Sequence, residues 1–244
     1  MVDHIVKSYD SEIKELRSVI SRMGGLVEDQ LTAAMQALTE CDVEAAQRIR
    51  RQDRHIDELE LLVEQTAVSI FARRAPVADD LREIISSLKM SSVLERAGDY
   101  AKNIAKRTVA IAGEKPVAFP QTLDRMTDLA REMLRDVMDA YVRRNTDAAL
   151  DVWYRDEQLD SLHNTAYRQI LARMMEMPDH IGTWTHLLMI AKNLERIGDQ
   201  ATNLAEQVYY SVKGTLLEDT RPKHDLTSDI VESATTSAKP GTAE

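Results

Sequence analysis

The sequence contains little of the material from which β-sheets and disulfide-bonded domains are built. Aromatic side chains make up 5% of its 244 residues, and glycine and proline occur only 8 and 6 times. A β-sandwich or barrel needs aromatic and β-branched strands separated by frequent turn residues, so this composition argues against both. Cys41 is the single cysteine, which excludes an internal disulfide.

Long apolar runs and an excess of positive charge are missing as well. No uninterrupted apolar stretch approaches the roughly 18 residues that a membrane span needs, and residues 1–7 lack the apolar core of a signal peptide. The 31 basic and 41 acidic residues give a net charge of −10, which leaves no broad positive surface for nucleic acid. We therefore expect a soluble, cytoplasmic protein that does not bind nucleic acid.

What the sequence does contain favours helices. Alanine, leucine, glutamate, arginine and methionine dominate, and these side chains lose the least conformational freedom in a helix. The chain is also long enough to bury a core without the help of disulfides. The expected fold class is all-α.

Breaks in the apolar periodicity divide the chain into six expected helices, which span residues 5–40, 43–73, 79–112, 121–144, 147–176 and 180–213. Four polar residues suit helix N-caps because their side chains can accept a backbone hydrogen bond: Asp42, Asp79, Thr146 and Asp179. Gly113 and Gly214 suit left-handed helix ends. The pair Gly24-Gly25 is expected to bend the first helix without ending it.

An internal repeat is the most informative feature. The segment Leu94-Glu95-Arg96-Ala97-Gly98-Asp99-Tyr100-Ala101-Lys102-Asn103 returns at Leu194–Asn203, so both copies read L-E-R-x-G-D-x-A-x-N at an offset of 100 residues. A weaker echo, D-x-x-(I/L)-D-x-L, begins at Asp53 and again at Asp156, an offset of 103 residues. Such repeats indicate two copies of one structural unit.

The repeat sets the expected domain organisation. Short connections make successive helices antiparallel, so we expect two pseudo-symmetric antiparallel three-helix bundles, one in residues 1–114 and one in residues 115–214. Residues 215–244 are polar and irregular, with too little apolar surface to fold. They are expected to form a disordered, flexible C-terminal tail.

The repeated segment gathers acids on one helix face. Residues four apart share a face of an α-helix, so each copy carries one oxygen-rich stripe. The two stripes consist of Glu95, Asp99 and Asn103, and of Glu195, Asp199 and Asn203. Each stripe lies roughly opposite the main apolar seam of its helix but in line with apolar residues nearer the N-terminus, which indicates a functional or interface surface.

Acids on the preceding helix can join each stripe. Asp53 and Asp57, and their equivalents Asp156 and Asp160, flank the apolar seam of the second helix of each copy. Four carboxylates per copy would repel one another and raise one another's pKa, so a cation is their natural neutraliser. Oxygen ligands favour hard ions such as magnesium, manganese, calcium or ferric iron over zinc or copper in soft sites.

The same acids could instead make interhelical ion pairs, because Arg96 and Arg196 stand beside them. The duplication of the glycine and asparagine together with the acids favours a site. Gly98 and Gly198 add to this, because a mid-helix glycine costs about 1 kcal/mol and usually marks the close approach of another backbone or a ligand.

Patterns typical of other chemistries are missing from the sequence. A ferritin-type di-iron centre needs Glu-x-x-His on two helices, and the nearest match is Asp160-x-x-His163, which has no counterpart in the first copy. Glycine-rich phosphate-binding loops are absent, and Cys41 has no evident histidine partner. We therefore expect no catalytic residues.

The two L-E-R-x-G-D-x-x-x-N segments, about one hundred residues apart, resemble those of the PhoU family of phosphate-uptake regulators. The segment Met23-Gly24-Gly25-Leu26-Val27-Glu28-x-Gln30-Leu31 adds to the resemblance. The resemblance extends through the helical region as far as Gly214 and does not include the tail. It implies a pair of pseudo-symmetric three-helix bundles, often dimeric, in the bacterial cytoplasm.

The resemblance also implies a function and partners. Family members lower phosphate import and keep the phosphate regulon off when phosphate is plentiful. The implied partners are the ATP-binding subunit of the phosphate ABC transporter and the sensor histidine kinase of the regulon, so membrane contact is expected only through them. Some members carry metal clusters on the E-x-x-x-D stripes, and the ion here, whether magnesium, manganese, iron or zinc, stays open.

The leading hypothesis is a non-enzymatic, metal-binding adaptor that represses the phosphate-starvation response. Two alternatives stand beside it. One is a carboxylate-bridged metalloprotein, either a hydrolase or a metal-storage protein. The other is a structural helical protein whose acids make only salt bridges.

Overall fold

The computed structural model describes residues 2–217, with side chains from residue 11 onward, and every regular element in that range is helical. These elements are α1 (Val2–Glu40), α2 (Val43–Gln52), α3 (Arg54–Arg73), α4 (Ala78–Ile111), α5 (Gln121–Arg143), α6 (Thr146–Glu176), the 3₁₀ turn η1 (Pro178–His180) and α7 (Ile181–Lys213). The all-α prediction is confirmed. No helix within residues 2–217 is both long and apolar enough to cross a membrane. Apart from residues 215–217, the expected tail lies outside the described residues.

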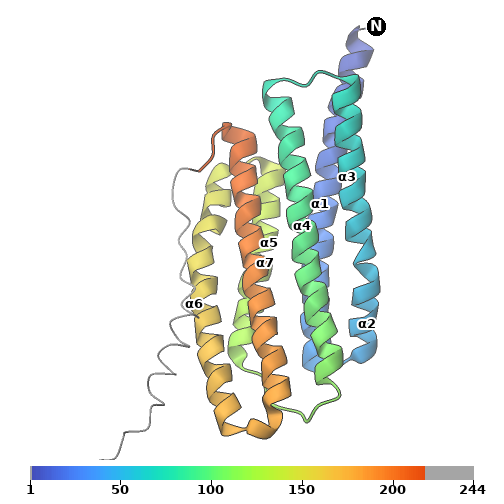
Figure 1. Ribbon diagram of the computed structural model, residues 1–244. Helices are drawn as coiled ribbons and strands as arrows, with labels where there is room; N and C mark the ends of the chain where they lie inside the picture. The colour runs from blue at the N-terminus through green and yellow to red at the C-terminus, as the bar shows by residue number, and fades with distance from the viewer. Residues whose placement is uncertain (1, 218–244) are drawn as a thin grey trace, which may run out of the picture.

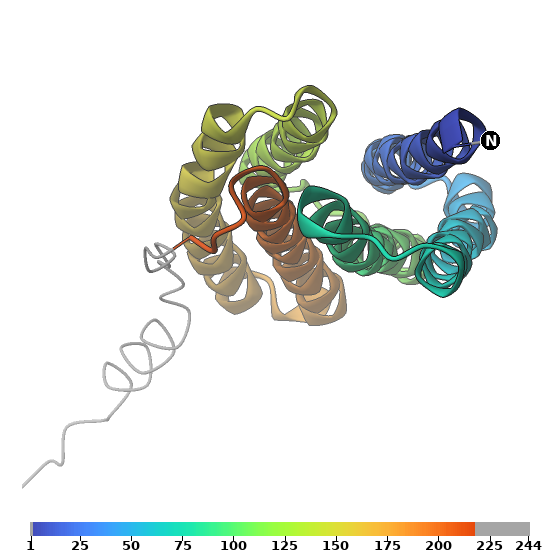
Figure 2. The same cartoon turned by 90° about the horizontal axis from the view of Figure 1, so that it is seen from above.

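The helices form two three-helix units that run in opposite directions. The first unit comprises α1, the α2–α3 pair and α4, and the second comprises α5, α6 and α7 (Figure 1). Helices α4 and α7 lie side by side at the centre, α3 and α6 flank them, and α1 packs against α5 (Figure 2). In Figure 1, α4 runs downward and α7 upward. The predicted pair of pseudo-symmetric antiparallel three-helix bundles is confirmed.

The expected helix boundaries agree with the structure to within a few residues, with one exception. The helix predicted over residues 43–73 is two helices, α2 and α3, which meet at Asp53. The backbone of Asp53 keeps helical angles, with φ −50° and ψ −34°, so the interruption is slight. Its importance lies in the side chain of Asp53, which the junction directs into the interior of the first unit.

Two of the predicted helix ends have the expected chemistry. The carboxylate of Asp42 accepts a hydrogen bond from the backbone nitrogen of Ala45 at 2.9 Å and caps α2. Gly214 ends α7 in the left-handed conformation, with φ 76°. Both residues satisfy backbone groups that a helix end leaves without partners.

The other end predictions are wrong. Asn145 caps α6 in place of Thr146, because its side chain accepts bonds from two backbone nitrogens of the first turn. Asp79 lies inside the first turn of α4, and Asp179 lies in the turn η1. Gly113 follows α4 without adopting a left-handed conformation. The capping propensities of these residues identified the region in which each helix begins or ends but not the exact residue, which is usual for helix boundaries.

Gly24 lies where the two units meet. A Cβ atom at this position would come within 2.7 Å of Cγ of Met138 on α5, so the missing side chain lets α1 approach α5. A Cβ atom on the neighbouring Gly25 would meet no atom within 4 Å. Helix α1 runs through both glycines without ending.

A buried glutamate joins the two units. Glu83 of α4 is 3% exposed and accepts two hydrogen bonds from Arg17 of α1, at 2.8 and 2.9 Å. Arg144, which follows α5, donates to the same carboxylate at 2.8 Å, and the Tyr141 hydroxyl donates to it at 3.2 Å. Burial and the nearby Glu83 charge raise the pKa of Tyr141, so the phenol keeps the proton that it donates.

Replacing Glu83 with alanine should lower the free energy of unfolding by about 1.5–3 kcal/mol, because the variant removes charge-assisted hydrogen bonds while the half-exposed Arg17 and Arg144 keep part of their solvation. Urea-induced unfolding followed by circular dichroism measures this. The matched control is Asp139→Ala, which removes an exposed carboxylate paired with Arg143, an interaction worth about 0–1 kcal/mol. Equal losses in the two variants would contradict the role given to Glu83.

Candidate functional site: two acidic clusters

Each repeated glycine lies where the second helix of its unit packs against the third. A Cβ atom on Gly98 would come within 2.8 Å of Cδ1 of Ile56 and 3.6 Å of Oδ1 of Asp53. A Cβ atom on Gly198 would come within 2.1 Å of Cδ2 of Leu159 on α6. The close approach expected at these glycines is therefore made by the neighbouring helix. It brings carboxylates of that helix against α4 and α7.

The first acidic cluster, here called the first cluster, consists of Asp53, Asp57, Glu95 and Asp99. A lysine lies among these acids: Nζ of Lys102 is 2.5 Å from Oδ2 of Asp53 and 2.6 Å from Oδ1 of Asp99. The amide of Gln30 on α1 donates to Oδ1 of Asp53 at 2.9 Å and to the carbonyl of Gly98 at 3.1 Å. Asp53 therefore connects all helices of the first unit.

Burial and charge differ across the first cluster. Asp53 is buried, Glu95 and Asp99 are half-buried, and Asp57 is exposed. Burial alone would lower the pKa of Lys102, but its contacts with Asp53 and Asp99 outweigh burial and raise the pKa. Burial, followed by the charges of Asp99 and Glu60, raises the pKa of Glu95 to about 7. Lys102 is therefore a permanent positive charge, whereas Glu95 can bind a proton near neutral pH.

The second acidic cluster, here called the second cluster, consists of Asp156, Asp160, Glu195 and Asp199. Three of these side chains are buried, with exposures of 2% for Asp156, 4% for Asp160 and 6% for Glu195. The sequence placed Glu195 outside the main core seam of its helix, yet its side chain is buried, whereas Asp53, Asp156 and Asp160, which were expected to flank the seam, are buried beside it. The close approach of the second helix to the third covers them. His163 and Asn164 of α6 are buried one turn beyond Asp160.

Glu195 is the least compensated carboxylate of the second cluster. Nζ of Lys192 donates to its Oε1 at 2.8 Å, but its Oε2 is buried and has no hydrogen-bond partner within residues 2–217. Burial and the charges of Asp199 and Asp160 raise the pKa of Glu195 to about 7, although Lys192 opposes the shift. Near neutral pH this carboxylate therefore responds to protons and to any cation that reaches it.

The arginines beside the acids have another role. Arg196 of α7 lies over the ring of Tyr100 on α4, 5.6 Å from its centroid, and so contacts the other central helix. Lys102 makes ion pairs with Asp53 and Asp99 in the first cluster, and Lys192 makes an ion pair with Glu195 in the second. Both lysines are three residues from their acids, a spacing that pairs side chains on a helix and could have identified them from the sequence.

The asparagines that end the two stripes, Asn103 and Asn203, are both half-buried. The side-chain amide of Asn203 donates to Oε1 of Gln200 at 3.5 Å. Each asparagine follows the last aspartate of its stripe by one helical turn. The stripes therefore continue beyond the carboxylates as predicted.

The two clusters differ in how well they suit a cation. Within the described residues, no three histidine, cysteine, aspartate or glutamate side chains already stand in an arrangement that could hold a metal ion. In the first cluster, the ammonium group of Lys102 already contacts Asp53 and Asp99, so an added ion would have to displace it from them. In the second cluster, three carboxylates are buried, and one oxygen of Glu195 has no hydrogen-bond partner within residues 2–217.

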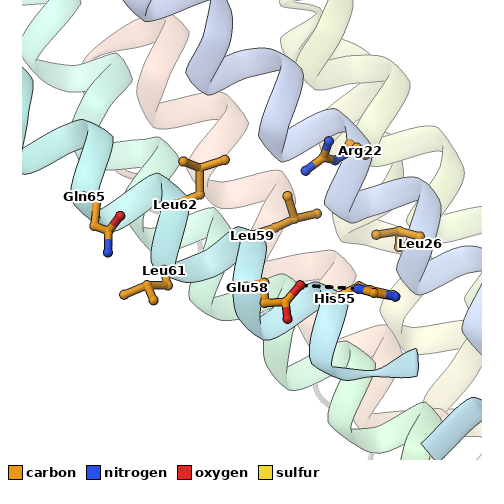
Figure 3. Close-up of a pocket in the computed structure, with 8 residues that line it drawn as sticks. All are labelled: Arg22, Leu26, His55, Glu58, Leu59, Leu61, Leu62 and Gln65. Carbon is orange, nitrogen blue, oxygen red and sulfur yellow. Dashed lines mark hydrogen bonds and ion pairs between the residues drawn. The ribbon is translucent and has the colours of Figure 1, made fainter. Parts of the chain in front are cut away.

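A separate pocket lies between α1 and α3, and none of its lining residues is a predicted site residue (Figure 3). Its lining residues are Arg22, Leu26, His55, Glu58, Leu59, Leu61, Leu62 and Gln65. The ring nitrogen Nδ1 of His55 and Oε2 of Glu58 are 3.4 Å apart at its edge. This pocket could not be predicted from the sequence, because its leucines also fit the apolar face of an ordinary helix.

Comparison with protein families finds one family model, described as the PhoU domain, which matches residues 20–108 and 123–208. The phosphate-specific transport system accessory protein PhoU homolog of Rhizobium meliloti is 40% identical over 228 residues, 93% of this chain and 96% of the relative. The homolog of the same description from Zymomonas mobilis is 44% identical over 229 residues, 93% of this chain and 97% of the relative.

Solved structures show the same likeness. The crystal structure of PhoU from Pseudomonas aeruginosa superposes with a TM-score of 0.81 at 37% identity, covering 85% of this chain and all of that one. The phosphate transport system regulatory protein PhoU from Streptococcus pneumoniae gives a TM-score of 0.80 at 29% identity, covering 86% of this chain and all of that one.

Gly198→Ala should lower the free energy of unfolding by roughly 1–2 kcal/mol, because the new methyl group would overlap the buried side chain of Leu159. Gly25→Ala is the matched control, since it introduces the same group into a helix interior with open space around it. It should raise stability by about 0.5–1 kcal/mol. Urea unfolding of both variants measures the difference, and a stabilised Gly198→Ala variant would contradict the close approach.

Glu195→Gln should weaken the pH dependence of stability in metal-free protein. The pKa of folded Glu195, about 7, lies above its ordinary value of 4.5. The stability contributed by its bound proton is therefore fully present below pH 4.5 and is lost as the pH rises to about 7. Glutamine cannot titrate, so stability should fall less over this window in the variant.

The measurement for this variant is urea unfolding in the presence of EDTA at several pH values across the window. Glu132→Gln on the exposed face of α5 is the control, and its curve should follow that of the original protein. Parallel curves for Glu195→Gln and the original protein would show that Glu195 does not titrate there.

Proposed function

Because the chain belongs to the PhoU family, we propose that it is a negative regulator of phosphate uptake and of the phosphate-starvation response. The observation that carries the proposal is the extent of the match. Relatives named as accessory proteins of a phosphate-specific transport system align with 93% of the chain. Both L-E-R-x-G-D-x-A-x-N segments lie inside the matched residues 20–108 and 123–208.

The proposed mode of action is that of a non-enzymatic adaptor in the cytoplasm. The proposed partners are the ATP-binding subunit of the phosphate ABC transporter and the sensor histidine kinase of the regulon, with the chain itself as a homodimer. The two acidic clusters support this role, because each includes acids of a central helix, α4 or α7, and Glu95, Asp99 and Asp199 are partly exposed there. Relatives named as accessory and regulatory proteins favour it over a hydrolase or a metal-storage protein.

Cation binding at the acidic clusters is a separate part of the proposal. The oxygen-only donors suit a hard divalent or ferric ion, with magnesium, manganese, iron and zinc as the candidates. The buried carboxylates of the second cluster support it, because an ion would relieve their repulsion. When bound, such an ion supplies a positive charge that can attract phosphate or a carboxylate of a partner.

The regulatory proposal predicts repression in a living cell. A bacterial host that lacks its own PhoU relative should produce high alkaline phosphatase activity in phosphate-rich medium, and this gene should restore low activity. A quadruple variant should fail to repress while keeping its helical content, because it removes the proposed contact surface. Its substitutions are Glu95→Ala, Asp99→Ala, Glu195→Ala and Asp199→Ala.

The matched control removes the same number of charges from the exposed face of α5. Its substitutions are Asp124→Ala, Asp128→Ala, Glu132→Ala and Asp139→Ala. This control should repress like the original protein. Persistent high activity with well-expressed original protein would argue against the regulatory proposal, and repression by the first quadruple variant would remove the clusters from it.

A further inference from the structure

A groove, here called the α1–α3 groove, runs between α1 and the α2–α3 pair of the first unit. It contains the pocket of Figure 3, with a volume of about 560 Å³, and a second pocket of about 270 Å³ that shares Leu26 and His55 with it. Figure 3 shows Leu59 and Leu62 on the side of α3 that faces α1. The apolar residues that line the two pockets are Leu26, Ala33, Ile49, Ile56, Leu59, Leu61 and Leu62.

Two leucines of the groove are in contact with solvent. Leu61 is 52% exposed and Leu62 is 36% exposed. At the offset of 103 residues, the second unit has Asn164 and Thr165 at these positions. Large apolar side chains that are exposed beside a pocket are typical of interaction sites, because covering them removes apolar surface from water. This offset also aligns α1 with α5, in which Met23, Leu26 and Leu31 recur as Met126, Leu129 and Leu134.

An ion pair bridges the equivalent helices of the second unit. Nη2 of Arg155 on α6 donates to Oδ2 of Asp136 on α5 at 2.7 Å. At the offset of 103 residues, Gln52 and Ala33 take these two positions in the first unit, and both line the smaller pocket of the groove. Alanine and glutamine cannot form an ion pair, so this bridge across the groove is missing. The pocket beside the bridge in the second unit is smaller, about 190 Å³, and has no leucine or isoleucine in its lining.

Exposed arginines stand at both ends of the groove. Arg22 lines the larger pocket. Arg48 and Arg51 precede the lining residues Gln52 and His55 by four positions, a spacing that places side chains on one face of a helix. The helical backbone angles at the junction of α2 and α3 keep this register. In a chain with a net charge of −10, such arginines favour an acidic partner, because complementary charge steers and orients association.

Two acids also line the groove. Oε2 of Glu58 is 3.4 Å from Nδ1 of His55, and Asp29 lines the smaller pocket. The three arginines outnumber these two acids, so the groove and its ends are positively charged. The lining of α1 from Arg22 to Ala33 extends over about 16 Å, or three turns of helix. A groove of this length and polarity matches the way in which an amphipathic helix inserts its apolar face between two helices.

We propose that the α1–α3 groove binds an acidic amphipathic helix of about three turns that belongs to a partner protein. Apolar side chains of that helix cover Leu61 and Leu62, and its acids meet Arg22 at one end of the groove and Arg48 and Arg51 at the other. This inference rests on the adaptor role proposed above, for which it supplies a docking surface on the first unit. It is independent of cation binding, because it uses none of the acids of the two clusters.

The test measures the binding of probe peptides to purified full-length protein by fluorescence anisotropy. The first probe is a labelled helical peptide of about four turns with leucines spaced i, i+4 and i+7 and with glutamates at both ends. The second probe carries lysines in place of the glutamates. The glutamate peptide should bind at least tenfold more tightly than the lysine peptide, and added salt should reduce this difference.

Variants of the groove should lose the glutamate peptide. Leu62→Lys places a charge on the apolar lining, and Ala33→Asp combined with Gln52→Arg rebuilds across the groove the ion pair of the second unit. Each of these variants should bind the peptide at least tenfold more weakly, and Arg51→Gln should bind it severalfold more weakly. Thr165→Lys is the matched control, because it introduces the same charge at the equivalent exposed position of α6 and should leave the affinity unchanged. Circular dichroism verifies the helical content of each variant.

Equal affinity for the two peptides, or unchanged affinity in both groove variants, would overturn the inference. Light scattering tests whether a second copy of the chain occupies the groove instead, and a dimer that dissociates in the groove variants without any peptide binding would overturn it. Tighter peptide binding after removal of residues 218–244 would also overturn it, because the chain itself would then supply the occupant.

The alkaline phosphatase experiment separates this inference from the proposed function. Leu62→Lys should repress less than the original protein, and Thr165→Lys should repress equally. Failure of the original protein to repress would contradict the proposed function, whatever the peptides show. Full repression by the original protein and by both groove variants would contradict the role of the groove alone.

Discussion

The acidic clusters depend on the missing side chains at Gly98 and Gly198. With a Cβ atom at either position, the end of the Ile56 or Leu159 side chain would have to move. The close approach brings Asp53 beside α4, and Asp156 of α6 beside Thr202 of α7. A glycine inside a helix lowers intrinsic helix stability by about 1 kcal/mol relative to alanine, and here that loss accompanies a specific helix contact.

The two units share this contact but not the interactions around it. Glu83 joins α1, α4 and the segment after α5, whereas Thr183 stands at the equivalent position of α7 and is buried. The first unit likewise satisfies its buried aspartate with an amide and an ammonium group, and the second uses a hydroxyl at the lysine position. The two units therefore have pseudo-symmetric backbones, but they differ in the charged and polar side chains at equivalent positions.

Much of the fold could be predicted from the sequence because its determinants are local. Helix lengths follow from apolar periodicity, and the offset of 100 residues between the L-E-R-x-G-D segments indicates two similar units. The break at Asp53 could not be foreseen, since its backbone angles remain helical and no proline or glycine marks it. The cap at Asn145 was missed because the adjacent Thr146 has the same capping chemistry.

The sequence predicted which acids share a helix face but not their burial or their pKa values. The spacing of Glu95, Asp99, Glu195 and Asp199 placed them correctly on repeated faces. Burial of the second-cluster acids depends on how closely α6 approaches α7, which is a property of tertiary packing. The contact of Gln30 with Asp53 joins residues 23 apart in the chain, so helical periodicity gives no indication of it.

The two clusters differ in their charged side chains, and this difference affects how a protein with this fold can respond to pH. Lys102 stays charged at neutral pH, because its contacts with carboxylates raise its pKa. The positive charge at the centre of the first cluster is therefore constant near neutral pH. Glu95 of the same cluster also has a pKa of about 7, but its side chain is half-buried, so solvent screens its charge. In the second cluster a buried carboxylate with a similar pKa has an oxygen without a hydrogen-bond partner within residues 2–217. A ligand shifts an equilibrium only through its preference for one state, and the raised pKa of Glu195 means that its proton binds more tightly when the carboxylate is buried. Protonation of this carboxylate therefore couples pH to the packing of the second unit.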